Sequence, residues 1–154
     1  MSVENLKKFA LKLGQTQNFI TNETVAILNQ KEVADDIEDF NTLQMIKEGV
    51  GADNVPFGNY APASVDIRHY AELQAEYIDL HFTGDFHESV TAEAFKSGKE
   101  PVVELGSTDP KWEGILKPQK RFEAALGLTE ENAIKVGGLI APLLAQRISN
   151  FWKI

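Results

Sequence analysis

The sequence predicts an α+β fold in which N-terminal helices precede a small antiparallel sheet with a β-hairpin and a long, kinked C-terminal helix. Three patterns predict it: helical spacing of apolar residues before residue 49, two short apolar runs around a glycine turn, and renewed helical spacing after residue 129. Helices and strands segregated along a chain are typical of the α+β class. The length of 154 residues indicates a single domain over residues 1–154, with residues 1–22 as an extended or helical N-terminal arm.

The first third of the chain carries two helical patterns. Apolar residues recur among lysines over residues 3–13, which predicts a short amphipathic helix that stops at Gly14. Thr21 and Asn22 can each cap a helix, and an interrupted helical pattern then continues over residues 25–49. Either one long helix or two shorter helices fit this second pattern.

The middle of the chain changes from turn residues to alternating residues. Three glycines and two prolines lie within residues 49–62, so we expect a loop or an extended excursion there. Apolar and polar residues then alternate over residues 77–82, which is the period of a half-buried strand. Thr83 or Asp85 can cap the turn of chain that starts at Phe86.

A β-hairpin is predicted in the second half of the chain. Two short apolar runs, over residues 90–94 and 102–105, are separated by a turn that contains Gly98. Pro101 starts the second run, where a missing amide proton is tolerated. We expect residues 108–119 to be irregular, because they contain two prolines and a glycine.

The C-terminal helix has a clear start signal. Thr129 is a good N-cap, and two glutamates follow it in the first turn, where they complement the helix dipole. Apolar residues then recur at helical spacing as far as Phe151. Pro142 removes a backbone hydrogen bond and clashes with the preceding turn, so we expect a kink near residues 138–142.

Charge is unevenly distributed along the chain. The net charge of -8, from 15 basic and 23 acidic residues, argues against a protein that grips nucleic acid or an anionic membrane. Residues 32–79 hold eleven acidic and two basic residues, whereas residues 111–121 hold four basic residues and one acidic residue. Blocks of opposite charge on one chain suit head-to-tail association of identical subunits around a ring. An ordinary solvated surface fits the same counts.

The sequence points to no catalytic or metal chemistry. The chain has no cysteine, which excludes disulfides, thiolate metal sites and a cysteine nucleophile. His81, Asp85 and His87 are close in sequence, but a strand over residues 77–82 would not bring them together on one face. Phosphate-binding glycine loops and a nucleophile elbow are also missing. We therefore expect no enzyme activity, no catalytic residues, no metal and no cofactor.

Four short motifs occur in order within residues 28–150, and together they resemble a family of small virion structural proteins from phages and prophages of Bacteroidetes, including the crAss-like phages. The motifs are Asp39-x-Asn41-x-x-Gln44-Met45-x-x-x-Gly49, Gly58-x-Tyr60-x-Pro62, Ile78-Asp79-Leu80-x-x-Thr83-Gly84-Asp85-Phe86-x-x-Ser89 and Leu126-Gly127-Leu128-Thr129-x-Glu131-Asn132. The commoner form of the family tends to place a basic residue and a glycine after the Gly-x-Tyr turn. In this chain the only basic residue there is Arg68.

The resemblance implies a tail-terminator-like or connector-like fold and a place in the neck or tail of a virion. A head–tail connector, tail completion protein or ring protein of this kind forms a cyclic oligomer, which we expect to be a hexamer or a dodecamer. Its partners would be adjacent portal, ring or tail proteins, with DNA only passing through the channel and with no membrane. Such a virion protein is assembled in the cytoplasm of the bacterial host. The positions that match the family motif, which we expect to be structural, are Gly58, Tyr60, Thr83, Gly84, Asp85 and Phe86.

The two charge blocks supply a hypothetical interface between subunits. One subunit would contribute the acidic residues Asp35, Asp36 and Asp39. The next subunit would contribute the basic residues Lys117, Lys120 and Arg121. Residues 1–31 have a net charge of +2, which also suits contact with an acidic neighbour. The alternative function is a small soluble domain that binds a ligand in a pocket beside the hairpin, without catalysis.

Overall fold

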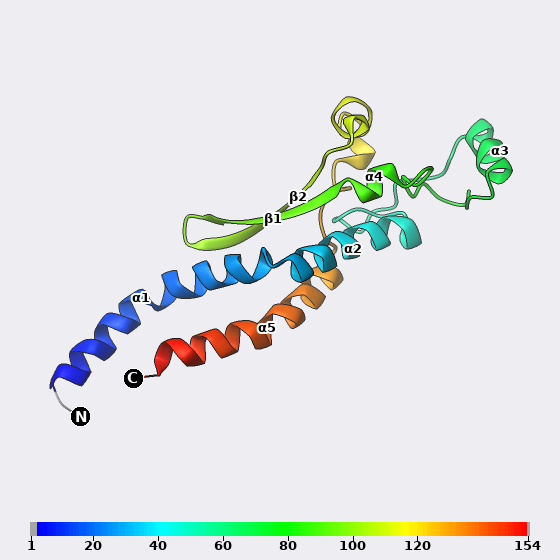
Figure 1. The fold of residues 1–154 in the computed structure, drawn as a ribbon. Helices are drawn as coiled ribbons and strands as arrows, with labels where there is room; N and C mark the ends of the chain where they lie inside the picture. Colours follow the sequence, from blue (N-terminus) through cyan, green and yellow to red (C-terminus); the bar gives the residue numbers. More distant parts are fainter. Residues whose placement is uncertain (1–2, 154) are drawn as a thin grey trace.

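The protein is described by a computed structural model that covers residues 3–153, and it has the α+β fold that the sequence predicts (Figure 1). Its elements are α1 (Val3–Leu28), α2 (Lys31–Glu48), α3 (Pro62–Tyr70), α4 (Asp85–Glu88), β1 (Val90–Ser97), β2 (Glu100–Ser107), a π-helical turn (Trp112–Leu116), a 3₁₀ turn (Lys120–Phe122) and α5 (Glu130–Trp152).

The molecule is elongated and has two different ends (Figure 1). At one end, which we call the tail, the first turns of α1 (residues 3–17) lie beside the last turns of α5 (residues 148–153). The opposite end, which we call the head, contains residues 49–88 and 108–128, with α3 at its extremity. The hairpin lies along α1 and α2 between the two ends.

α1 is one continuous helix of 26 residues, so the predicted stop at Gly14 is wrong. Gly14 is exposed, and a Cβ built on it would meet nothing within 4 Å. A glycine at such a position costs a helix only about 1 kcal/mol relative to alanine. Thr21 is also not a cap: its hydroxyl lies 2.7 Å from the carbonyl oxygen of Lys99 and joins α1 to the hairpin turn.

The second helical pattern corresponds to two helices. α1 ends at Leu28, and α2 begins at Lys31. α2 ends at Glu48 and Gly49 caps it, which agrees with the predicted end: Gly49 adopts a left-handed conformation (φ 63°), and its N–H donates to the carbonyl of Met45.

The predicted strand over residues 77–82 is wrong. Ile78 and Asp79 are both buried, so the expected alternation between an inner and an outer face does not hold. Leu80 adopts a positive φ of 57°, which an extended strand does not tolerate. The expected cap is also different, because α4 begins after Gly84 (φ 96°) without a side-chain cap.

The predicted hairpin is confirmed. β1 and β2 pair in antiparallel register around a turn in which Gly98 has a φ of 61°. The free edge of β1 faces helices rather than water. Ala94 exchanges hydrogen bonds of 2.7 and 2.8 Å with the side chain of Asn29, and the N–H of Ala92 donates to Glu38 at 2.9 Å. The hairpin is therefore fixed on α1 and α2, and its edge is protected from pairing with other strands.

The C-terminal helix starts as predicted. The Thr129 side chain accepts a hydrogen bond from the N–H of Asn132 at 3.3 Å, as an N-cap does. α5 continues through Pro142, and its axis changes direction along its length (Figure 1). Gln44 of α2 fixes this start, because its side-chain oxygen accepts from the N–H of Thr129 and its amide donates to the carbonyl of Gly127.

Two apolar clusters form the core, and α2 contributes to both. The cluster in the head contains Met45, Phe57, Ile78, Phe86, Trp112, Phe122 and Ala125. The cluster between α1, α2, β1 and α5 contains Ile27, Leu28, Val33, Ile37, Ala94 and Val136.

Candidate functional site

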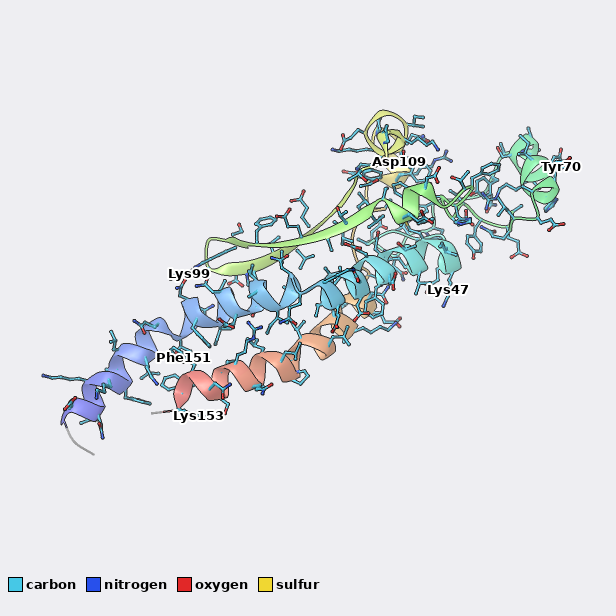
Figure 2. All side chains as sticks on the ribbon, viewed as in Figure 1. Lys47, Tyr70, Lys99, Asp109, Phe151 and Lys153 are labelled. Atoms are coloured by element: carbon cyan, nitrogen blue, oxygen red, sulfur yellow. The ribbon has the colours of Figure 1, made fainter. Side chains whose placement is uncertain are left out.

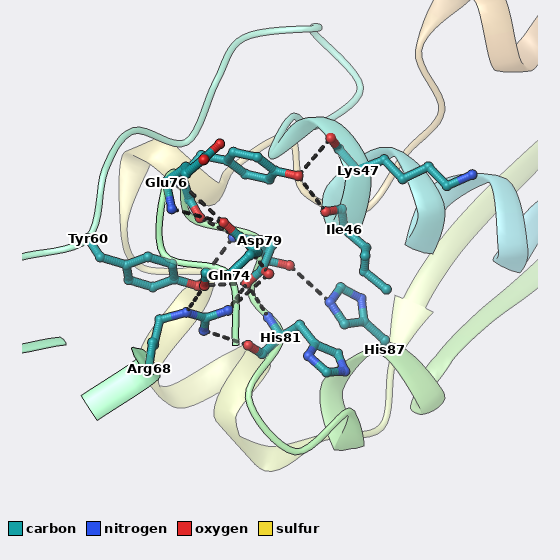
Figure 3. A network of polar contacts seen from close by, with 10 residues as sticks. Ile46, Lys47, Tyr60, Arg68, Gln74, Glu76, Asp79, His81 and His87 are labelled. Carbon is teal, nitrogen blue, oxygen red and sulfur yellow. Dashed lines mark hydrogen bonds and ion pairs between the residues drawn. The ribbon is translucent and has the colours of Figure 1, made fainter. Parts of the chain in front are cut away.

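A buried ion pair between Arg68 and Asp79 organises the head (Figure 3). Arg68 lies on α3 and Asp79 in the loop before α4, and their exposed fractions are only 4% and 2%. Nη2 of Arg68 lies 3.0 Å from both carboxylate oxygens of Asp79. Two charges are stable at such depth only when their other polar atoms are also bonded.

The remaining polar atoms of the pair are bonded. Asp79 accepts hydrogen bonds from the hydroxyl of Tyr60 at 2.7 Å, from the amide of Gln74 at 2.6 Å and from the N–H of His81 at 2.9 Å. Arg68 donates to the carbonyl oxygens of Gln74 at 2.5 Å and His81 at 2.6 Å. Burial, together with the hydrogen bond to Asp79, raises the pKa of Tyr60 to about 12, so its hydroxyl stays protonated and donates.

The network fixes the path of three separate chain segments. The guanidinium of Arg68 also lies 4.3 Å from the centre of the Tyr60 ring, a cation–π distance. Residues 57–60, helix α3 and residues 74–81 are thereby held together. A charge pair with all its bonds made inside the protein suits a positioning role rather than proton transfer.

His87 lies on the other side of Asp79. Its Nε2 is 3.0 Å from the carbonyl oxygen of Asp79, whereas its Nδ1 is buried without a partner. Its ring stacks on that of His81 at a centroid distance of 5.7 Å. Burial lowers the pKa of His87, and the neighbouring His81 acts in the same direction. The neutral ring with its proton on Nε2 satisfies this arrangement, because a second proton on Nδ1 would find no acceptor.

Acidification is expected to destabilise the protein through His87. The unfolded state binds a proton with a pKa near 6.5, and the folded state binds it at lower pH, so the free energy of unfolding falls as the pH drops below about 6.5. Urea unfolding of the wild type between about pH 7.5 and 5.5 measures this slope. His87→Gln should flatten it, and the control His69→Gln, at an exposed position of α3, should leave it unchanged. Equal slopes in the wild type and His87→Gln would contradict this assignment.

An open groove with a volume of about 640 Å³ lies beside the network. Its floor includes the buried Phe86 and Phe122. The large apolar side chains at its rim, with exposed fractions of 58%, 55% and 59%, are Ile67, Phe82 and Ile115. Exposed apolar residues gathered around a concave surface mark contacts with other molecules. This groove, which we call the head groove, is the candidate functional site.

The head groove has two walls, which come from separate parts of the chain. Residues 59–68 and 78–86 form one wall, and the π-helical turn with residues 119–122 forms the other. The Arg68–Asp79 pair fixes the first wall, and Phe86 joins the two walls by stacking on Trp112 at 5.8 Å. A second hollow of about 680 Å³ lies beside β2. The alternative function, a small ligand-binding domain, predicts a pocket beside the hairpin.

The structure places the matching motif residues in or near the head groove. Gly58 and Gly84 have positive φ angles of 103° and 96°, which glycine adopts most readily. Tyr60 belongs to the buried network, and Phe86 belongs to the core of the head. The exposed motif residues beside the groove are Thr83 and Asp85. Their structural role remains a prediction.

The predicted interface residues are exposed. Those that form an ion pair do so with a residue four positions away in the chain. Asp35 contacts Lys31 at 2.6 Å, while Asp36 and Asp39 are exposed on the same helix. Among the basic residues, Lys117 contacts Glu113 at 2.9 Å, Arg121 lies over the ring of Phe122, and Lys120 is exposed. Within residues 3–153 no ion pair joins the acidic block to the basic block. A contact between these blocks would therefore form between subunits, and it remains a prediction.

Arg68, Gln74 and the pairing of Asp79 are the site features that sequence reasoning missed. The available signal was a lone arginine in the acidic stretch of residues 32–79. The guanidinium of this arginine could pair with any of several carboxylates in the stretch, and the sequence does not show which carboxylate becomes buried beside it.

The described part of the chain contains no cluster of three His, Asp or Glu side chains that could hold a metal ion. None of the helices within residues 3–153 has the length and hydropathy that crossing a bilayer requires. Comparisons with protein-family models, with curated proteins and with solved structures give no match for this chain. Its function is therefore inferred from its residues, their geometry and the motifs quoted above.

Proposed function

We propose that this chain is a structural subunit that assembles with copies of itself into a ring in the neck or tail of a phage particle, around the DNA channel. The observation that supports assembly is the composition of residues 136–145 of α5, none of which has a polar side chain although the outer side of the helix is exposed. The place in a phage particle rests on the motif resemblance. Adjacent portal, ring or tail proteins would then be its further partners.

α5 has far more apolar surface than its packing within the chain uses. No charged residue occurs between Lys135 and Arg147. The inner side packs on α1 and α2, with Val136 buried. On the outer side, Ile134 and Leu139 have exposed fractions of 68% and 39%. A helical stretch that is apolar all round is normally buried on all sides, so residues 136–145 of α5 support the presence of a neighbouring molecule.

The outer side of α5 also has the spacing of a helix–helix contact. Apolar residues that follow one another at intervals of four and three are Ile134, Gly138, Ala141, Ala145 and Ile148. The three central residues are small and exposed, which lets a second helix approach closely. We call this set the α5 seam and assign it to contact with a neighbouring subunit.

The overall charge suits a wall around passing DNA. Phosphate contacts made by lysine and arginine are what hold DNA to a protein. A subunit with a net charge of -8 adheres weakly to DNA, which would let DNA move along the channel.

A charge in the α5 seam is expected to disrupt assembly without unfolding the subunit. Ala141→Glu places a carboxylate at an exposed position of the isolated chain and at a buried position of the proposed contact, so we expect at least about a tenfold loss of association. The control Gln146→Glu adds the same side chain at an exposed position of α5 outside the seam. Light scattering after size exclusion gives the mass of each variant, and circular dichroism reports its helix content.

Three results of this comparison bear on the proposal. An oligomeric wild type, an oligomeric Gln146→Glu and a folded, dissociated Ala141→Glu would support it. Equal masses for all three chains would contradict the role of the seam. A wild type that stays monomeric would contradict the whole proposal and favour the small ligand-binding domain instead.

A further inference from the structure

We infer that the outer edge of β2 binds an extended segment of another protein, whose backbone pairs with Val103 and Leu105 and whose basic side chain lies beside Glu104. The inference goes beyond the proposed ring, because it concerns a surface of the hairpin and not the α5 seam. Two observations carry it: backbone groups of β2 without a bonding partner within residues 3–153, and carboxylates beside them without a cation in the same part of the chain.

The register of the hairpin shows which backbone groups of β2 point outwards. In an antiparallel pair, residues that bond to the partner strand alternate with residues whose N–H and C=O both point away from it. Both backbone groups of Ala94 on β1 bond to the side chain of Asn29, so they point away from β2. Ala94 lies opposite Val103. The N–H and C=O of Val103, and those of Leu105 two residues further on, therefore point to the outer edge of β2.

The outer edge of β2 is open, whereas the edge of β1 is covered by side chains of α1 and α2. Within residues 3–153, no hydrogen bond from outside the hairpin reaches the backbone of Val103 or Leu105. Figure 2 shows the two ends of this strand, with Lys99 at the hairpin turn and Asp109 beside the head. Pro101 lacks an N–H and blunts only the start of the edge. An open edge of this kind is a template for a further strand.

The second hollow, of about 680 Å³, lies along this edge. Residues from both faces of β2 line it, Val103 and Leu105 from one face and Val102 and Glu104 from the other. The opposite wall is formed by the π-helical turn and by residues between positions 123 and 128. The space beside the backbone groups of the edge is therefore accessible to another chain.

Carboxylates predominate beside the edge. The charged residues that line the hollow are Glu104, Glu113, Glu123 and Lys117, and Lys117 is already paired with Glu113. Glu104 also lies directly opposite Glu93 on β1, a position in which like charges destabilise a sheet. Within residues 3–153 neither Glu93 nor Glu104 forms an ion pair. A basic side chain of the occupant would relieve this repulsion, so charge favours a cationic segment.

The faces of β2 define the side chains of the occupant. In an added strand, the residue beside Glu104 lies on the exposed face, and the residues before and after it lie on the face of Val103 and Leu105. That face is apolar, because both residues pack on the core cluster between the helices and the hairpin. The edge therefore fits an extended segment in which a basic residue stands between two apolar residues. Backbone hydrogen bonds give such an added strand its affinity, and alternate side chains give it specificity.

A second copy of this chain does not supply such a segment. Its β2 carries Glu104 between Val103 and Leu105, so pairing of two β2 edges would add carboxylates to a surface that already has too many. Lysine does stand between two apolar residues at positions 11–13 and 134–136, but both stretches are helical. We therefore assign the edge to a segment of a different protein.

Titration with designed peptides tests this inference. The probe is a seven-residue peptide in which valine and lysine alternate, and the matched control peptide has glutamate in place of lysine. Fluorescence anisotropy should show that the 154-residue chain binds the lysine peptide at least about tenfold more tightly than the glutamate peptide. Glu104→Lys should remove this preference. Glu100→Lys, at an exposed position of β2 outside the hollow, should keep it, which separates pairing at the edge from general attraction to an acidic chain.

Amide exchange followed by NMR locates the bound peptide. In the free chain, the N–H groups of Val103 and Leu105 should exchange faster than those of Val102 and Glu104, which bond to β1, and the lysine peptide should slow the exchange of the first two. Unchanged exchange at these two positions, protection of another surface instead, or no binding at about 1 mM peptide would overturn the inference. Ala141→Glu should bind the peptide as the wild type does, so the edge and the proposed ring are tested separately.

Discussion

Asp79→Ala is expected to lower the free energy of unfolding by about 3–5 kcal/mol, because it leaves the guanidinium of Arg68 buried without its counter-ion. The substitution also removes the acceptor of the Tyr60 hydroxyl and of the Gln74 amide. A buried donor without an acceptor is more costly than a hydrogen bond that was never made. Because the Arg68–Asp79 pair fixes the first wall of the head groove, we expect that wall to lose its fixed position in this variant.

Urea unfolding with a reporter in the head measures this effect. Trp112 belongs to the head core, whereas Trp152 lies in the tail, so a Trp152→Phe background makes fluorescence report on the head. The double variant Arg68→Met and Asp79→Ala removes both charges and should recover part of the lost stability. Equal stabilities of the single and double variants, or a loss below about 1 kcal/mol, would show that the ion pair does not organise the head.

Gly51→Ala is expected to destabilise the head by at least about 2 kcal/mol, because a side chain at this position has no space. A Cβ built on Gly51 would lie 2.2 Å from the carbonyl oxygen of Ala124 and 2.6 Å from its carbonyl carbon. These are backbone atoms, so the two segments would have to separate. Their separation would also break the hydrogen bond of 2.7 Å from the N–H of Ala52 to Ala124.

A second glycine provides the matched control for this change. Gly14→Ala makes the same substitution in the exposed part of α1, where a Cβ meets nothing within 4 Å. We expect this variant to be as stable as the wild type or up to about 1 kcal/mol more stable, because alanine favours a helix. Thermal unfolding of both variants compares them, and a Gly51→Ala variant as stable as Gly14→Ala would contradict the close contact.

Local signals allowed the hairpin and the helix ends to be predicted from the sequence. The turn at Gly98, the cap at Thr129 and the left-handed end at Gly49 each depend on conformational preferences of a few neighbouring residues. Gly14 shows the limit of such signals, because a weak helix former is tolerated when packing holds the helix on both sides of it.

The features that depend on tertiary contacts could not be predicted. Alternation over residues 77–82 predicts a strand in which Asp79 faces solvent, whereas in the structure Arg68 holds the carboxylate of Asp79 in the interior. The head groove is built from three segments that are distant in sequence, and no local pattern shows that they converge. The α5 seam was present in the sequence, but its outer side could be recognised only once α1 and α2 were seen to occupy the inner one.

The mass of the unmodified protein in solution tests the proposed assembly of this chain with copies of itself. Light scattering of the 154-residue chain, which has a mass of 17.1 kDa, should give a single species whose mass is a fixed multiple of that value over a range of concentrations. A ring predicts this behaviour because each subunit completes both of its contacts on closure. A mass of 17.1 kDa at every concentration would contradict the proposed assembly.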